Sequence, residues 1–207
     1  MPRRDDIETI LVLGSGPIKI GQAAEFDFSG SQAVKALRED GYRVILVNSN
    51  PATIQNDPEM ADVVYIEPLL PETIKRIMEI ERPCALLAGM GGQTALNIAS
   101  ELAHNGTLEE LGIELIGSDL DAIDKAEDRQ LFNDVCESIG LPLSEAIACN
   151  TMDEVIAAAE QLASWPILIR PAFTLGGLGG GTAWDVGQLV EIATLGLRNS
   201  RISQVLI

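Results

Sequence analysis

The first half of the chain alternates short apolar runs with longer stretches that mix apolar and polar residues. Five runs rich in aliphatic residues predict β-strands at 10–13, 43–47, 63–66, 85–88 and 114–116. Between them, apolar residues recur at helical spacing and predict helices at about 31–39, 71–81 and 93–102. Parallel strands need crossover connections of this length, usually through a helix. We therefore expect an α/β fold, a Rossmann-like doubly wound parallel sheet, over residues 1–118.

The pattern changes after Ser118 to a charged helical passage that stops at the Gly-Leu-Pro of residues 140–142. We place a domain boundary near Ser118. Residues 119–207 then predict the N-terminal part of a second, α+β domain, and the expected elements are a helix at 152–162, a strand at 166–171, a glycine-rich loop, a helix from about 186 and a strand at 204–207. An apolar strand at a chain end leaves an edge open to pairing, so we interpret this second domain as truncated.

Composition and charge narrow the classes of partner. The 207 residues are 46% hydrophobic, which is enough for one core and the start of another. Lysine and arginine total 14 against 31 acidic residues, for a formal charge of −17. Such a field repels nucleic acid and anionic membrane surfaces, so we expect neither as a partner. The charged start holds no apolar segment of signal-peptide or membrane-span length, and we expect a cytoplasmic protein.

Cysteine and histidine positions argue against a structural metal. Cys84, Cys136 and Cys149 share no close spacing, and His104 has no cysteine nearby in sequence. We therefore expect no zinc site.

The first glycine motif, GSGPIKIGQ at residues 14–22, follows the first predicted strand. Open parallel sheets bind ligands at this edge. A dinucleotide fingerprint would need a third glycine where Lys19 stands and an acid where the second strand ends at Asn48 and Asn50, so a nicotinamide cofactor is disfavoured. A Walker loop also fails, because Gln22 and Ala23 follow its second glycine.

Two functional interpretations of this edge remain. A similar loop, GMGGQT at residues 89–94, follows the fourth predicted strand. The two loops together favour a crevice along the edge of the sheet. The alternative is that the glycines only form tight strand-to-helix turns.

The second glycine motif follows an apolar strand that carries a single cation, Arg170. Five of the six residues at 176–181 are glycine, and glycine lets backbone amides wrap phosphate oxygens and lets a flap close. We expect the Arg170 guanidinium, set among aliphatic neighbours, to need an anionic partner. A nucleotide polyphosphate would be that partner; the alternative is an ion pair with Asp or Glu beside a loop without a ligand.

The chain resembles the large subunits of carbamoyl phosphate synthetase over essentially its whole length. The stretches that carry the resemblance are GSGPIKIGQ at 14–22, EFDFSG at 25–30, VNSNPATI at 47–54, DPEMAD at 57–62, MGGQTALN at 90–97, AEDR at 126–129 and IRPAFTLGG at 169–177. The resemblance implies a pre-ATP-grasp domain followed by the start of an ATP-grasp domain, in the half that makes carboxyphosphate from bicarbonate and ATP.

The resemblance also implies the site and its partners. Arg129, Arg170, Gly176 and Gly177 match nucleotide contacts of the family, and the two arginines would take catalytic roles by neutralising charge on the transferring phosphoryl group. Expected ligands are ATP and bicarbonate, with Mg or Mn held by residues that lie beyond this chain. A glutaminase small subunit would supply ammonia, and homo-oligomers are compatible with the sequence.

Two other functions stay open. One is another ATP-grasp carboxylase of the biotin-dependent type, and the other is a catalytically inactive docking module. We expect residues 1–207 alone to be inactive. Trp165 and Trp184 flank the second glycine motif, and we interpret both as packing residues.

Overall fold

The computed structural model describes residues 3–17, 25–174 and 177–207, apart from the side chains of Glu25 and Arg129. The chain divides into two compact units, Met1–Ile123 and Asp124–Ile207, and each is described by itself. The division falls inside helix α5 (Leu120–Glu127), whereas the boundary proposed from the sequence lies near Ser118, just before this helix.

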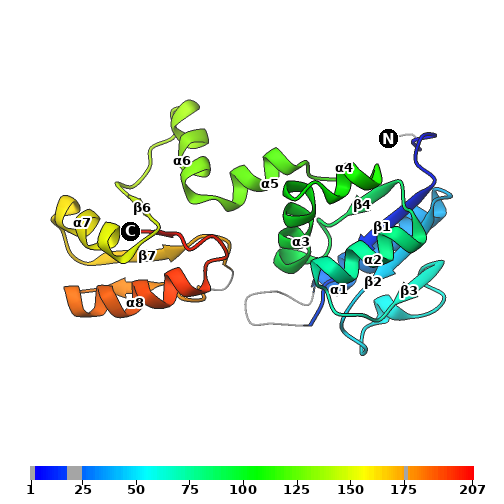
Figure 1. The fold of residues 1–207 in the computed structure, drawn as a ribbon, viewed down its shortest axis with the longest axis horizontal. Helices are drawn as coiled ribbons and strands as arrows, with labels where there is room; N and C mark the ends of the chain where they lie inside the picture. Colours follow the sequence, from blue (N-terminus) through cyan, green and yellow to red (C-terminus); the bar gives the residue numbers. More distant parts are fainter. Residues whose placement is uncertain (1–2, 18–24, 175–176) are drawn as a thin grey trace. The chain divides into compact units, whose positions relative to one another are not determined.

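The first unit is built on a five-stranded parallel sheet (Figure 1). Its strands are β1 (Thr9–Leu13), β2 (Arg43–Val47), β3 (Val63–Tyr65), β4 (Ala85–Leu87) and β5 (Glu114–Ile116). Their order is β3-β2-β1-β4-β5, so the direction of winding reverses between β1 and β4. This arrangement confirms the predicted doubly wound α/β fold.

Helices cover both faces of this sheet because side chains alternate along each strand. Val12 packs with Val34 of α1 (Glu25–Glu39) on one face. Leu11 packs on the other face with α2 (Pro71–Glu81) and α3 (Gly92–His104). The strands are buried on both sides, which explains their continuous apolar runs.

The predicted helix at 71–81 has the bounds observed for α2, with Pro71 in its first turn. Two short elements were not predicted: the 3-10 helix η1 (Ile54–Asn56) and helix α4 (Thr107–Leu111). Neither is long enough to show a helical repeat in its apolar residues.

The second unit contains an antiparallel sheet of order β6-β9-β7-β8. Residues of two helices, α7 and α8, share one core cluster with the inward-facing residues of this sheet. Its elements are α6 (Arg129–Ser138), β6 (Ala148–Cys149), α7 (Met152–Leu162), β7 (Ile167–Pro171), β8 (Gly181–Ala183), α8 (Val186–Asn199) and β9 (Val205–Leu206). Helix α7 has the predicted bounds. Strands β6 and β8 were not predicted, because two and three residues are too few for a visible alternation.

One face of the second sheet is exposed. Ile167 and Ile169 point into the core beneath α7 and α8, whereas Leu168 between them is 55% exposed. Trp184 follows the buried Ala183 of β8, so alternation places it on the exposed face, where it is 66% exposed. Trp165, just before β7, is 41% exposed. The interpretation of these tryptophans as packing residues is therefore wrong. Across the described parts of both units, no helix combines the length and apolar character needed to cross a membrane.

Candidate functional site

The glycines of the first motif serve close packing. Gly16 has φ +67°, and its N–H donates to Asn48 Oδ1 at 3.0 Å. A Cβ on Gly14 would lie 2.7 Å from the Asn48 side chain. A Cβ on Gly91, in the loop after β4, would lie 2.6 Å from the carbonyl oxygens of Leu13 and Gly14. The two glycine loops thus pack directly on each other, as the tight-turn alternative expects; Lys19 and the rest of 18–24 lie outside the described residues.

Asn48 organises this edge of the first sheet. It is fully buried, and its Oδ1 also accepts from the Asn50 N–H at 3.2 Å. Its Nδ2 donates to Gln55 Oε1 at 3.1 Å, and Gln55 Nε2 donates to the Phe26 carbonyl at 3.0 Å. An amide therefore ties β2, the first glycine loop and α1 together at the position where a dinucleotide fold would carry an acid.

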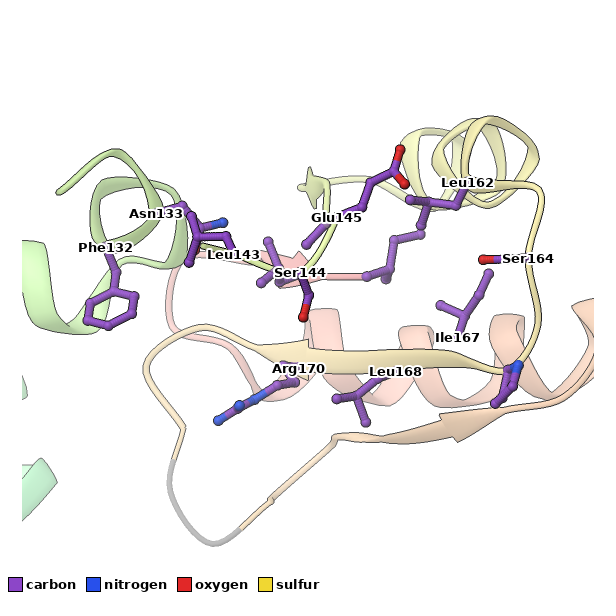
Figure 2. A pocket seen from close by; sticks show the side chains of 14 residues that line it. Phe132, Asn133, Leu143, Ser144, Glu145, Leu162, Ser164, Ile167, Leu168 and Arg170 are labelled. Carbon is purple, nitrogen blue, oxygen red and sulfur yellow. The ribbon is translucent and has the colours of Figure 1, made fainter. Parts of the chain in front are cut away.

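The second unit holds a cavity of about 440 Å³ beside β7 (Figure 2). Three segments that are distant in sequence supply its walls: Phe132 and Asn133 of α6, Leu143 and Ser144 ahead of β6, and Leu168 and Arg170 of β7. Its volume is in the range of small-molecule sites, which run from about 300 to 1,000 Å³. Most of the walls are apolar, and Arg170 is the basic residue among the lining side chains.

Arg170 is exposed, so the expectation that its guanidinium is buried among aliphatic residues is wrong. The apolar neighbours Ile169 and Pro171 face the core, whereas Arg170 shares the opposite side of β7 with Leu168 (Figure 2). Within the described part of the chain, no carboxylate forms an ion pair with Arg170. Its charge is therefore available to a ligand in the cavity.

The other predicted site residues are described only in part. Arg129 is the first residue of α6, whose N-terminus is capped by Asp128 through bonds from the N–H groups of Gln130 at 2.8 Å and Leu131 at 2.9 Å. The Arg129 side chain lies outside the description, but Phe132, one turn further along α6, lines the cavity. The structure thus brings the start of α6 and Arg170 to one cavity.

Gly176 lies outside the described residues, and Gly177 lies in the turn that joins β7 to β8. Gly177 has φ +73°, its carbonyl accepts from the Gly180 N–H at 3.0 Å, and nothing stands within 4 Å of where its Cβ would be. A Cβ on Gly180 would lie 3.0 Å from the Ile169 carbonyl oxygen. The end of the turn, at Gly180, therefore packs against β7, whereas the position of a Cβ on Gly177 is open.

This arrangement suits a ligand with an apolar body and an anionic group. The apolar walls would contact the body, and Arg170 with the backbone of the glycine turn would bind the anion. Of the site residues predicted from the sequence, Arg170 lines this cavity, and the prediction did not name Phe132, Leu143 or Ser144. The sequence carried a signal for Leu168 alone. Leu168 stands two positions before Arg170 in the same strand, and alternation places residues two apart on the same face. Among the described residues, no group of three or more His, Cys, Asp or Glu side chains is placed to hold a metal ion.

Solved structures share the fold at low sequence identity. The biotin carboxylase domain of 2-oxoglutarate carboxylase from Hydrogenobacter thermophilus, in complex with MgADP, ADP and bicarbonate, has a TM-score of 0.71 and 19% identity, over 98% of this chain and 44% of that one. D-alanine–D-alanine ligase from Bacillus anthracis, in complex with ATP, has a TM-score of 0.59 and 16% identity, over 96% of this chain and 58% of that one. These similarities establish the fold alone.

Sequence comparison identifies the family. Residues 6–125 match the carbamoyl phosphate synthase preATP-grasp domain, and residues 128–207 match the ATP binding domain of the carbamoyl-phosphate synthase L chain. The carbamoyl phosphate synthase large chains of Nostoc sp. and Archaeoglobus fulgidus are each 56% identical over all 207 residues. The chain spans 19% of the length of these relatives. It therefore belongs to the carbamoyl phosphate synthase large-chain family and matches its preATP-grasp and ATP-binding domains.

Proposed function

We propose that this chain supplies part of the ATP site in the half of a carbamoyl phosphate synthase large chain that phosphorylates bicarbonate. The observation that carries the proposal is the cavity beside β7, where the Arg170 guanidinium stands on an exposed sheet face close to the glycine turn. A cation at the rim of an apolar cavity, with no ion-pair partner among the described residues, fits a phosphorylated ligand. Family membership makes ATP the expected one.

In the proposed reaction a bicarbonate oxygen attacks the γ-phosphorus of ATP, which gives carboxyphosphate and ADP. Ammonia then attacks the carboxyl carbon and expels inorganic phosphate, which leaves carbamate. A second half of the enzyme phosphorylates carbamate with another ATP, so carbamoyl phosphate is the product. A glutaminase small subunit would release the ammonia from glutamine, and the product would serve arginine and pyrimidine biosynthesis in the cytoplasm.

The residues of this chain would act by binding and orienting the nucleotide. Arg170 and Arg129 would neutralise negative charge on the phosphates, and the backbone around Gly176 and Gly177 would donate N–H groups to phosphate oxygens. Fixed donors of this kind stabilise the transition state because phosphoryl transfer depends mainly on positioning and electrostatics. Apolar walls such as Phe132 and Leu168 would exclude water from one side of the ligand.

When bound, the family's Mg or Mn would neutralise negative charge on the phosphates. As part of the proposal, we assign its ligands to the part of the large chain that lies beyond residues 1–207. It follows that residues 1–207 alone should show no bicarbonate-dependent ATP hydrolysis. Turnover by this 207-residue protein would contradict the assignment.

The proposal is tested with Arg170→Ala in the full-length gene product. We expect kcat/KM for ATP in bicarbonate-dependent hydrolysis to fall about 10- to 100-fold, since a charge-assisted phosphate contact is lost. Arg198→Ala is the matched control, because Arg198 is also exposed but stands in the last turn of α8 and is not among the residues that line the cavity. Equal kinetics for both variants and the parent would overturn the placement of the site.

Two alternatives give different results in the same assays. A biotin-dependent carboxylase would couple ATP hydrolysis to carboxylation of free biotin, whereas a carbamoyl phosphate synthase would couple it to ammonia. A docking module would bind the glutaminase subunit yet show no turnover in the full-length product. The relatives at 56% identity favour the synthase, while the biotin carboxylase likeness at 19% identity extends only to the fold.

A further inference from the structure

The side chain of Gln204 carries a buried oxygen without a partner. Gln204 is 8% exposed, and none of the described residues donates a hydrogen bond to its Oε1. Its backbone is satisfied, because the N–H donates to Ser200 Oγ at 3.1 Å and the carbonyl accepts from the Ala172 N–H at 3.0 Å. Buried polar atoms are nearly always paired, so an unpaired one calls for a functional or structural explanation.

Strand register places Gln204 next to the candidate site. Arg170 of β7 pairs with Leu206 of β9, and Gln204 stands two residues before Leu206. Because Val205 between them is in the core, alternation puts Gln204 on the face that carries Leu206 and Arg170. Gln204 is thus the diagonal neighbour of Arg170, and such neighbours lie about 7–8 Å apart, within reach of long side chains.

The backbone just after β7 and just before β9 is held in an uncommon conformation. Phe173, directly after Ala172, has φ +53°, and Ser203, directly before Gln204, has φ +51°. Left-handed backbone at residues other than glycine is costly and clusters at functional sites. The guanidinium of Arg201 lies 5.1 Å from the centroid of the Phe173 ring and braces this segment.

We propose that Gln204 is a positioning residue for Arg170 when the nucleotide is bound. Its Oε1 accepts one guanidinium N–H, while other N–H groups of the same guanidinium bind a phosphate. A guanidinium has five N–H donors in a planar fork, and a phosphate takes two of them along one edge, so a donor remains for the amide oxygen. The second bond fixes the plane of the guanidinium. This inference rests on the proposed ATP site.

The test is a double-mutant cycle on the full-length gene product, read out as the dissociation constant for ATP. Gln204→Met removes the acceptor at similar volume, and Gln204→Leu is a second apolar variant if the first does not fold. We expect ATP affinity to fall about tenfold, with the melting temperature unchanged or raised because an unpaired buried oxygen is removed. Gln204→Glu keeps an acceptor oxygen and should restore affinity to within about threefold of the parent.

The effect of Gln204→Met in the Arg170→Ala variant tests whether Gln204 acts through Arg170. If Gln204 acts through Arg170, Gln204→Met should have no further effect on ATP affinity once the guanidinium is gone. Equal losses in both backgrounds, or no loss in either, would overturn the inference; the latter is the result expected if a buried water satisfies Oε1. An unchanged ATP affinity in Arg170→Ala itself would instead refute the proposed ATP site, so the two failures are distinguishable.

Discussion

Gly179 of the glycine turn and Gly196 of α8 pack against each other with no side chain between them. A Cβ on Gly179 would lie 3.2 Å from Gly196 Cα, and a Cβ on Gly196 would lie 3.1 Å from the Gly179 carbonyl oxygen. The contact joins the turn that follows β7 to the helix beneath the sheet. The second half of the turn is therefore anchored to the core of the second unit.

Gly196→Ala should loosen this anchor. The new methyl group would also meet Val205 Cγ1 at 2.8 Å, and overpacking of this kind costs about 1–3 kcal/mol, of which better helix propensity offsets about 1 kcal/mol. We expect a lower urea midpoint, followed by tryptophan fluorescence, since Trp165 and Trp184 both lie in the second unit. Gly187→Ala in the same helix is the control and should lower the midpoint less, because its methyl would meet one atom only, at 3.2 Å, the Asp185 Oδ1 that caps the helix. Equal midpoints for the two variants would count against the anchor.

Asn48→Ala should destabilise the first unit by about 2–4 kcal/mol, because it leaves the Gly16 N–H and the Gln55 amide without their buried partner. The free energy of unfolding, measured by circular dichroism in urea, checks this. Asn150→Ala is a control at an exposed asparagine and should change stability by less than about 0.5 kcal/mol. Faster hydrogen exchange at the Gly16 amide should accompany the loss, and unaltered exchange would contradict the role given to Asn48.

Glu81 should contribute a pH-dependent stability. Arg43 Nη2 donates to its carboxylate at 2.6 Å and holds the pKa of Glu81 below its usual range; the Tyr65 hydroxyl, whose own pKa is raised by this bond, donates to the other oxygen at 2.7 Å. A lowered folded-state pKa stabilises the fold above the unfolded pKa of about 4.3, and the gain is lost as pH falls through the folded value.

Glu81→Gln isolates the charge, because the amide still accepts from Tyr65. We expect the variant to lose about 1 kcal/mol near neutral pH, a modest value since Arg43 is partly exposed, and to match the parent in strong acid. High salt should shrink the difference at neutral pH. A gap between the two proteins that stays constant across the acid range would rule out the linkage.

Cys149 should resist thiol reagents in the folded protein. Burial, followed by the nearby Glu154, raises the pKa of its thiol to about 11, so little reactive thiolate is present at mildly alkaline pH. Cys84 is only half-buried and should be alkylated first, as followed by peptide mass spectrometry. In denaturant, Cys149 and Cys84 should be alkylated at similar rates. Rapid labelling of Cys149 without denaturant would mean that the second unit opens readily.

The sequence by itself determined the architecture of the first unit and part of the candidate site. Apolar runs such as Arg43–Val47, separated by helical repeats such as Pro71–Glu81, permit little except a parallel sheet covered on both faces. These signals are local, because the period of apolar residues in a strand or a helix can be recognised from a few consecutive residues. Arg170 and Gly177 were also predicted from a local signal, since a cation followed by a glycine run is a contiguous pattern.

Tertiary structure decided which groups meet and which face stays open. Alternation shows that β7 has two faces, yet only the packing of α7 and α8 determines that Ile169 is buried while Arg170 and Leu168 are exposed. The cavity walls, the Asn48–Gln55 bond and the Gly179–Gly196 contact join segments whose separation along the chain leaves no periodic signal. Such contacts depend on how complete elements pack together, and a residue's own neighbours in sequence do not encode that packing.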